Sequence, residues 1–126
     1  MTPPVSRTLA AHTVGELLYY SFPALDALSF VRHGFSTRLG GVSEGIWRSM
    51  NLSFTRGDSP TAVAENFRRF CAAIGVRAED TVISAQTHTT HVISVTAADR
   101  GRGVTRPREY TDVDGMVTDE PGVVLC

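Results

Sequence analysis

The stretch SPTAVAENFRRFCAAIG, Ser59–Gly75, carries the clearest secondary-structure signal in the chain. Ser59 can accept hydrogen bonds from amides of a first helical turn, and Pro60 suits the first helical position, where its missing N–H costs nothing. Apolar side chains follow at spacings of three and four, which places them on one helix face: Val63, Phe67, Phe70, Cys71 and Ile74. Gly75 can end the helix in the left-handed conformation. The stretch therefore predicts one amphipathic helix with a core face.

Strands and loops are expected on the N-terminal side of this helix. Aromatic and β-branched residues bounded by proline or glycine favour strands in ELLYYSF (16–22), SFVRHGFSTR (29–38) and MNLSF (50–54). The glycine-rich segment LGGVSEGIW between the last two predicts a loop. We expect residues 1–15 to be a loosely attached lead-in.

The C-terminal side of the helix continues this mixture. TVISAQTHTTHVISVT (81–96) predicts two strands or one long bent strand, and the polar segment 97–115 predicts a loop. GMVTDEPGVVLC (115–126) predicts a strand, a turn and a strand. The fold class is therefore α/β or α+β, rich in strands, with residues 1–126 forming a single domain.

Composition excludes several classes of protein. An apolar content of 42 % with 20 % charged residues argues against intrinsic disorder, and a net charge of −1 gives no basic face for nucleic acid. No signal peptide and no apolar run long enough for a membrane span are visible. Cys71 and Cys126 are far apart and lack zinc-finger or redox spacing, so we expect no disulfide framework and a cytoplasmic location.

The last residues, GVVLC, are an apolar run typical of a buried central strand, with no turn or polar tail after them. Domains rarely end in the middle of such a strand. We therefore expect the sequence to be a fragment.

Two histidines, His88 and His91, lie in the segment SAQTHTTHVISV, Ser84–Val95. Residues three apart on a strand point to opposite faces, so both could bind one metal ion only if the backbone bends between them. The residues by themselves favour two polar strand positions with one solvated. A metal site stays open as the alternative.

The loop TRLGGVSEG offers a second candidate site. Arg38 with the backbone of Gly40 and Gly41 could bind an anion, although the loop is not a Walker motif and a plain tight turn is the simpler interpretation. Asp112 and Asp114 alternate and could share a strand face, where they could position a ligand hydroxyl or simply cap the backbone.

Four motifs in order carry a resemblance that none carries alone: HGFSTRLGGVSEGIWRSMNLSF, GDSPTAVAENFRRF, QTHTTHV and TDVDGMVTDEPGVVL. Together they resemble the N-terminal half of the YfiH-like family, from about His33 to the last residue. That family was first labelled laccase-type multicopper polyphenol oxidoreductase. Its members are regarded as zinc-dependent purine nucleoside phosphorylases with adenosine deaminase and methylthioadenosine phosphorylase activity.

The resemblance implies a metal ligand and a fold. His88 matches the histidine of the family's Q-x-H motif, one of three zinc ligands, and is thereby the expected catalytic metal residue. His91 falls at a variable position and is expected to be incidental. The other two ligands lie in ADC and H-x-GWRG motifs that do not occur here, and Cys126 does not match the ligand cysteine. The implied fold is an incomplete half of a layered α/β/β/α sandwich.

The resemblance also implies substrates. The whole protein would cleave purine nucleosides with phosphate, with Arg38, Gly40 and Gly41 as candidate substrate contacts and with Asn51 and Asp114 shaping the pocket. The chain alone is expected to be inactive without the missing C-terminal half. It is also expected to aggregate, to self-associate through strand edges that this half would cover, or to remain partly unfolded.

Two other functions compete with this interpretation. One is a non-catalytic interaction module that persists by pairing with itself or a partner. The other is a copper-dependent phenol oxidase, which is disfavoured because copper oxidases need several histidine-rich centres, whereas only His88 lies in a ligand motif.

Overall fold

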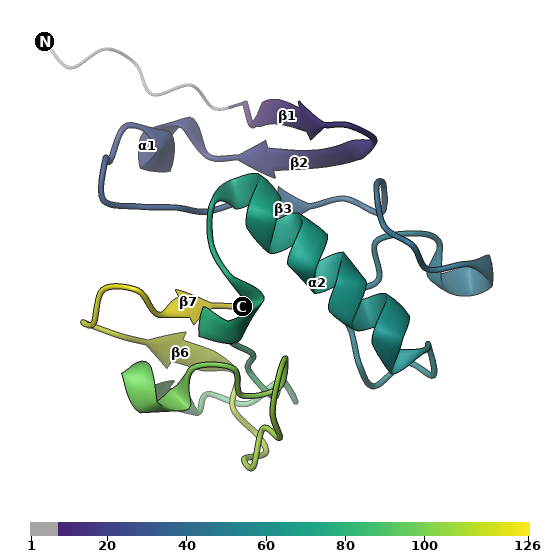
Figure 1. Ribbon diagram of the computed structural model, residues 1–126. Coiled ribbons are helices and arrows are strands. Elements are labelled where there is room, and N and C mark those ends of the chain that lie inside the picture. Colours follow the sequence, from purple (N-terminus) through teal and green to yellow (C-terminus); the bar gives the residue numbers. More distant parts are fainter. Residues whose placement is uncertain (1–7) are drawn as a thin grey trace, which may run out of the picture. The chain divides into compact units, whose positions relative to one another are not determined.

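The computed structural model describes residues 8–126. The chain forms two compact units, one up to Gly75 and one from Val76 to Cys126 (Figure 1). Both units combine helical and extended segments, so the mixed α+β class is confirmed.

The first unit contains a three-stranded antiparallel sheet in the order β1-β2-β3. These strands are β1 (Ala10–Val14), β2 (Leu17–Ser21) and β3 (Phe35–Ser36). β1 pairs with β2 along its whole length, from Ala10 opposite Ser21 to Val14 opposite Leu17. The loose lead-in expected over residues 1–15 is therefore wrong for the paired strand β1, and residues 1–7 lie outside the described residues.

The predicted helix is α2 (Pro60–Ile74), and its ends agree with the prediction. The Ser59 hydroxyl accepts the Ala62 N–H, and Gly75 is left-handed with φ 79°. On its apolar face, the Phe70 ring meets Tyr19 of β2 edge-on, with 6.2 Å between centroids. The helix thus packs on the sheet of its own unit, where aromatic contact adds to apolar burial.

The segments around β3 are less extended than expected. A short helix α1 (Pro23–Asp26) follows β2, and the 3-10 turn η1 (Gly45–Trp47) lies in the glycine-rich loop. Only Phe35–Ser36 of the segment 29–38 is strand, and residues 50–54 form none. In the latter segment the Asn51 side chain bonds both the N–H and the carbonyl of Ser53, a local turn that competes with strand pairing.

The second unit consists of two short parallel strand pairs and two 3-10 turns. β4 (Thr81–Val82) pairs with β7 (Val124–Leu125), and β5 (Val92–Ser94) pairs with β6 (Gly115–Val117). The turns are η2 (Ala78–Asp80) and η3 (Ala97–Asp99). The strand, turn and strand expected over 115–126 are confirmed, whereas residues 83–91 form an irregular segment between β4 and β5.

A small apolar core holds the second unit together. It consists of Val82, Ala85, Val95 and Val113, each at most 7 % exposed. Ala85 and Val113 form an antiparallel bridge with both hydrogen bonds, at 2.9 and 3.0 Å, which fixes the two polar segments that follow them. Over the described residues, no helix is long and apolar enough to cross a membrane.

Candidate functional site

The loop that carries His88 is held by the carboxylate of Asp114. The Thr87 N–H donates to Asp114 Oδ1 at 3.0 Å and the His88 N–H donates to Asp114 Oδ2 at 2.8 Å. The Thr89 hydroxyl donates to Oδ1 at 2.9 Å. Three consecutive residues of the loop are therefore tied to one side chain that follows the buried Val113.

His88 adopts a left-handed backbone conformation, with φ 65°. The expectation of a strand at this position is wrong, because the loop bends here and the side chain lies exposed to solvent. Left-handed backbone is unfavourable for an L-residue with a β-carbon, by about 1–2 kcal/mol. Among residues 8–126, no group hydrogen-bonds to its imidazole.

His91 is placed differently. Its Nδ1 lies 3.0 Å from the carbonyl oxygen of Asp112, so one ring nitrogen is engaged with the backbone. The two histidines therefore differ in geometry: the His91 ring contacts the backbone, whereas the His88 ring has no hydrogen-bond partner among residues 8–126.

The hydrogen bonds also act on the charge of Asp114. They lower its pKa to about 2, chiefly through the backbone groups of Thr89 and Thr87, because N–H donors favour the ionised carboxylate. Asp114 is therefore an anion at neutral pH. Both of its oxygens are engaged by the loop, so it shapes the site and offers little to a substrate hydroxyl.

The second unit does not form a complete metal site. In the part of the chain that the structure describes, no three His, Cys, Asp or Glu side chains are grouped closely enough to hold a metal ion. A catalytic zinc site takes three protein ligands and keeps one open position. The exposed, unengaged imidazole of His88 suits one of these ligands, and the described residues do not supply the other two.

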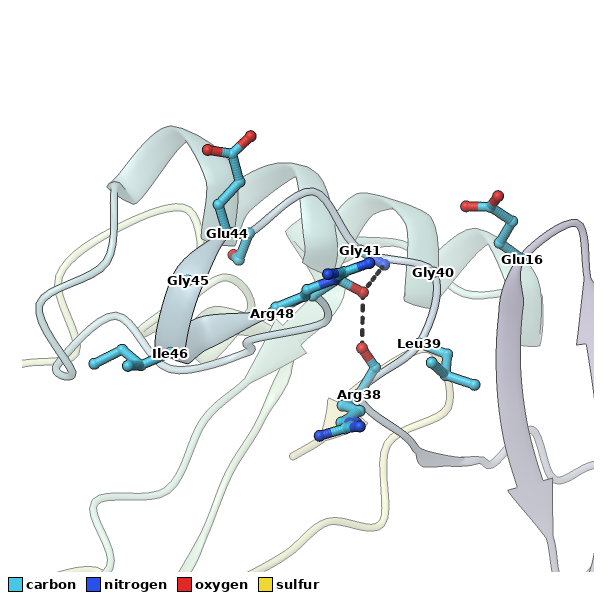
Figure 2. A pocket seen from close by; sticks show the side chains of 11 residues that line it. Glu16, Arg38, Leu39, Gly40, Gly41, Glu44, Gly45, Ile46 and Arg48 are labelled. Carbon is cyan, nitrogen blue, oxygen red and sulfur yellow. Dashed lines mark hydrogen bonds between the residues drawn. The ribbon is translucent and has the colours of Figure 1, made fainter.

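A separate open cavity of about 1200 Å³ lies in the first unit (Figure 2). It brings together three of the candidate residues, Arg38, Gly40 and Gly41. Arg48 also lines the cavity, and neither guanidinium has a hydrogen-bond or ion-pair partner among the described residues. Two carboxylates, Glu16 and Glu44, also line the cavity. The cavity thus offers cationic and anionic groups to a polar ligand.

Close backbone packing explains the two glycines. A β-carbon at Gly40 would lie 2.3 Å from Leu17 Cα, and one at Gly41 would lie 2.0 Å from the carbonyl oxygen of Ser49. The Gly41 N–H donates to Ser49 Oγ at 3.2 Å, and that hydroxyl donates to the Arg38 carbonyl at 2.8 Å (Figure 2). The sequence suggested that the Gly41 N–H could bind an anion, but this N–H already donates to Ser49.

Asn51 forms hydrogen bonds to residues that flank the glycine loop and the helix. Its side-chain amide nitrogen donates to Asp58 Oδ2 at 3.1 Å, and its backbone carbonyl oxygen accepts from the side-chain amide of Asn66 at 2.8 Å. Asn66, fully buried on α2, also accepts the Val42 N–H and donates to Ser43 Oγ. The Asn51 side chain is thus engaged in a polar network that ties the glycine loop to the helix.

Sequence reasoning missed two features of this region. Arg48 carried no signal, because it lies in the loop that follows the glycine motif and belongs to no charge pattern. Asn66 could have been found as a polar residue one position before Phe67 on the apolar face of the helix, since buried asparagine usually supports a hydrogen-bond network.

Comparison with known proteins gives the relatives of this chain. The model of the family described as multi-copper polyphenol oxidoreductase laccase matches residues 32–126. The purine nucleoside phosphorylase of Deinococcus radiodurans is 39 % identical over 96 residues, 76 % of this chain and 34 % of the relative. Purine nucleoside phosphorylase YlmD of Geobacillus stearothermophilus is 37 % identical over 94 residues, 74 % of this chain and 34 % of the relative.

Solved structures show the same likeness. The crystal structure of YlmD from Geobacillus stearothermophilus matches with a TM-score of 0.75 and 29 % identity, covering 91 % of this chain and 42 % of that one. The crystal structure of Bacillus licheniformis YfiH matches with a TM-score of 0.76 and 27 % identity, over 89 % and 40 %. The chain therefore has part of the fold of YlmD and YfiH. It spans about one third of the length of the two purine nucleoside phosphorylases above. The chain belongs to the YfiH-like family.

Proposed function

We propose that the whole protein is a zinc-dependent purine nucleoside phosphorylase in which His88 is one of three zinc ligands. The names of the curated relatives support the reaction class. One observation in the chain supports the residue: His88 combines an exposed imidazole without a hydrogen-bond partner among the described residues with a left-handed backbone. Backbone outliers of this kind cluster at functional sites.

The reaction class fixes which bonds change. A phosphate oxygen forms a bond to C1′ of the ribose while the bond from C1′ to the purine nitrogen breaks, and its electron pair stays with the base, which takes up a proton. The products are the free base and the sugar 1-phosphate, which is ribose 1-phosphate from adenosine or inosine and keeps the 5′-methylthio group when methylthioadenosine is the substrate. Zinc supplies Lewis-acid polarisation when bound, or lowers the pKa of a water molecule for the deamination of adenosine. We include adenosine, inosine and methylthioadenosine as substrates.

Arg38 and Arg48 are our candidates for contacts to phosphate. A guanidinium can donate two parallel hydrogen bonds to phosphate oxygens. The guanidiniums of Arg38 and Arg48 form no ion pair among the described residues, so no such contact has to break when phosphate binds. Glu16 and Glu44 suit ribose hydroxyls, because carboxylates accept hydrogen bonds from them.

The test is an assay of the whole protein with inosine or adenosine, with and without phosphate. We expect phosphate-dependent release of free base and ribose 1-phosphate, lost in His88→Ala and retained in His91→Ala. The 126-residue chain alone should release no base, because its described residues hold only one ligand. Loss of zinc and activity in His91→Ala but not in His88→Ala would contradict the assignment. Copper-dependent oxidation of phenols without phosphorolysis would favour the function named in the family description instead.

Phosphate binding to the first unit gives a separate test. In the 126-residue chain, inorganic phosphate should shift amide resonances of residues 38–49, and Arg38→Ala and Arg48→Ala should each weaken this binding. Arg56→Ala is the matched control, because this exposed arginine does not line the cavity. Equal loss in all three variants would show only general charge attraction.

A further inference from the structure

We propose that Asp114 is the positioning residue for His88: its carboxylate fixes the 87–89 turn in the conformation that presents the imidazole to solvent. This inference rests on the proposed function, in which His88 is a zinc ligand. It gives Asp114 a different role from the positioning of a ligand hydroxyl, which the sequence left open.

The contacts leave Asp114 well suited to this task. Its two oxygens receive three hydrogen bonds from consecutive residues of the loop, at 2.8 to 3.0 Å. The hydrogen bond from the His88 N–H depends directly on the backbone conformation of His88. An extended backbone at His88 would turn the preceding peptide plane and break the geometry of this bond.

The carboxylate is itself mounted on a fixed segment. The neighbouring Val113 is 1 % exposed and bridges Ala85 through two hydrogen bonds. The Asp114 N–H donates to the His91 carbonyl at 3.0 Å, which closes the far end of the loop. The loop therefore depends on Asp114 for its shape, whereas Asp114 is held by the buried core of its unit.

Asp112 provides the comparison that isolates this role. It is also an aspartate of this loop region, but among residues 8–126 its carboxylate accepts only the Thr87 hydroxyl, at 2.9 Å, and no backbone amide of the turn. Its own φ of 55° is one that asparagine tolerates. Asp112→Asn is thus a matched control for Asp114→Asn, with the same loss of charge two residues away.

The first experiment measures the conformation of the loop in the 126-residue chain by nuclear magnetic resonance. The wild-type chain should show a scalar coupling across the hydrogen bond from the His88 amide to the Asp114 carboxylate. Its one-bond Cα–Hα coupling at His88 should report positive φ. Asp114→Asn should move this coupling towards extended values, and Asp112→Asn should leave it unchanged. The wild-type measurement decides the matter even if the Asp114 variant does not fold.

The second experiment measures zinc affinity of the whole protein by competition with a chelator, without any assay of activity. Asp114→Asn should weaken zinc binding about 10- to 100-fold, the usual effect of removing a group that orients a ligand. Asp112→Asn should weaken it less than about threefold.

The outcomes separate this proposal from the proposed function. Zinc retained in full by His88→Ala would refute the ligand itself. Zinc lost in His88→Ala but held equally well by Asp114→Asn and the wild type would refute positioning by Asp114 alone. Absence of the hydrogen-bond coupling in the wild-type chain would refute it as well.

Discussion

The His88 N–H donates to Asp114 Oδ2 at 2.8 Å while the His88 backbone is left-handed, with φ 65°. This hydrogen bond therefore holds His88 in a backbone conformation that is unfavourable for a residue with a β-carbon. This relationship separates His88 from His91, which lacks both features and lies three residues further along the same exposed segment.

The first prediction concerns stability at this position. His88→Gly should stabilise the chain by up to about 1 kcal/mol, because relief of the left-handed cost of about 1–2 kcal/mol exceeds the entropy that glycine adds to the unfolded chain, roughly 0.5–1 kcal/mol. Urea unfolding of the 126-residue chain measures this. His91→Gly is the control and should destabilise, since its φ is not positive. Equal losses in both variants would contradict the prediction.

The second prediction concerns acid. Asp114 has its pKa lowered from 3.8 to about 2, so its contribution to stability is present above the unfolded pKa and is lost as the pH falls from about 4 to about 2. Asp114→Asn should therefore be less stable than the wild type at pH 6, with the difference vanishing towards pH 2. Glu65 titrates in the same range, so both proteins should carry Glu65→Gln. A difference that does not change with pH would disprove the linkage.

The local signals of the sequence explain why the helix was predictable and the loop was not. Ser59, Pro60 and Gly75 act on their own neighbours, so the bounds of α2 follow from short-range rules. The turn at His88 depends on Asp114, 26 residues away, and no periodicity encodes that contact. A strand was expected there because threonine and valine are β-formers, a preference that tertiary contacts override.

The glycine loop was also only partly predictable from the sequence. Its glycines predicted a loop correctly, but the sequence suggested that Gly41 would bind an anion, whereas its N–H is taken by Ser49. The cavity residue Arg48 could not have been chosen from local pattern. Whether Arg38 and Arg48 bind phosphate stays a prediction.

The third prediction tests the packing reason for Gly40. Gly40→Ala should destabilise the chain by more than about 3 kcal/mol, for two reasons. The new β-carbon would lie 2.3 Å from Leu17 Cα, and the backbone φ of 91° is unfavourable for alanine. Gly45→Ala is the matched control, with φ 61° and no atom within 4 Å, and should lose only about 1 kcal/mol. Thermal or urea unfolding of the two variants measures the difference, and equal losses would show that the close approach to Leu17 does not matter.

The fourth prediction tests the buried network on α2. Asn66→Leu should destabilise by about 2 kcal/mol or more, because the Val42 N–H and the Asn51 carbonyl lose the Asn66 side chain as a partner and a buried unsatisfied polar group costs about 1–3 kcal/mol. Ala64→Leu introduces the same side chain at an exposed position of the same helix and should change stability little. If both variants unfold at the same urea concentration, the network contributes nothing measurable.

The last prediction concerns the edge of β7. Parallel strands are usually buried with neighbours on both sides, yet among residues 8–126 β7 pairs only with β4, and Leu125 is 39 % exposed. On its other side β4 is bonded by Gly101, which donates to the Thr81 carbonyl, and the following Ile83 donates to the Arg102 carbonyl, so the open edge belongs to β7. An unpaired edge with apolar side chains is a template for a second copy, and covering such a side chain fully contributes roughly 1.5–3 kcal/mol.

We therefore expect the 126-residue chain to self-associate with rising concentration, measured by size-exclusion chromatography with light scattering. Leu125→Lys should reduce this association, because a charged side chain on an edge strand opposes pairing. Amide exchange at residues 123–125 should slow as association increases in the wild type and stay fast in the variant. A wild-type monomer at all concentrations, with these amides already strongly protected, would show that the edge is satisfied within one chain.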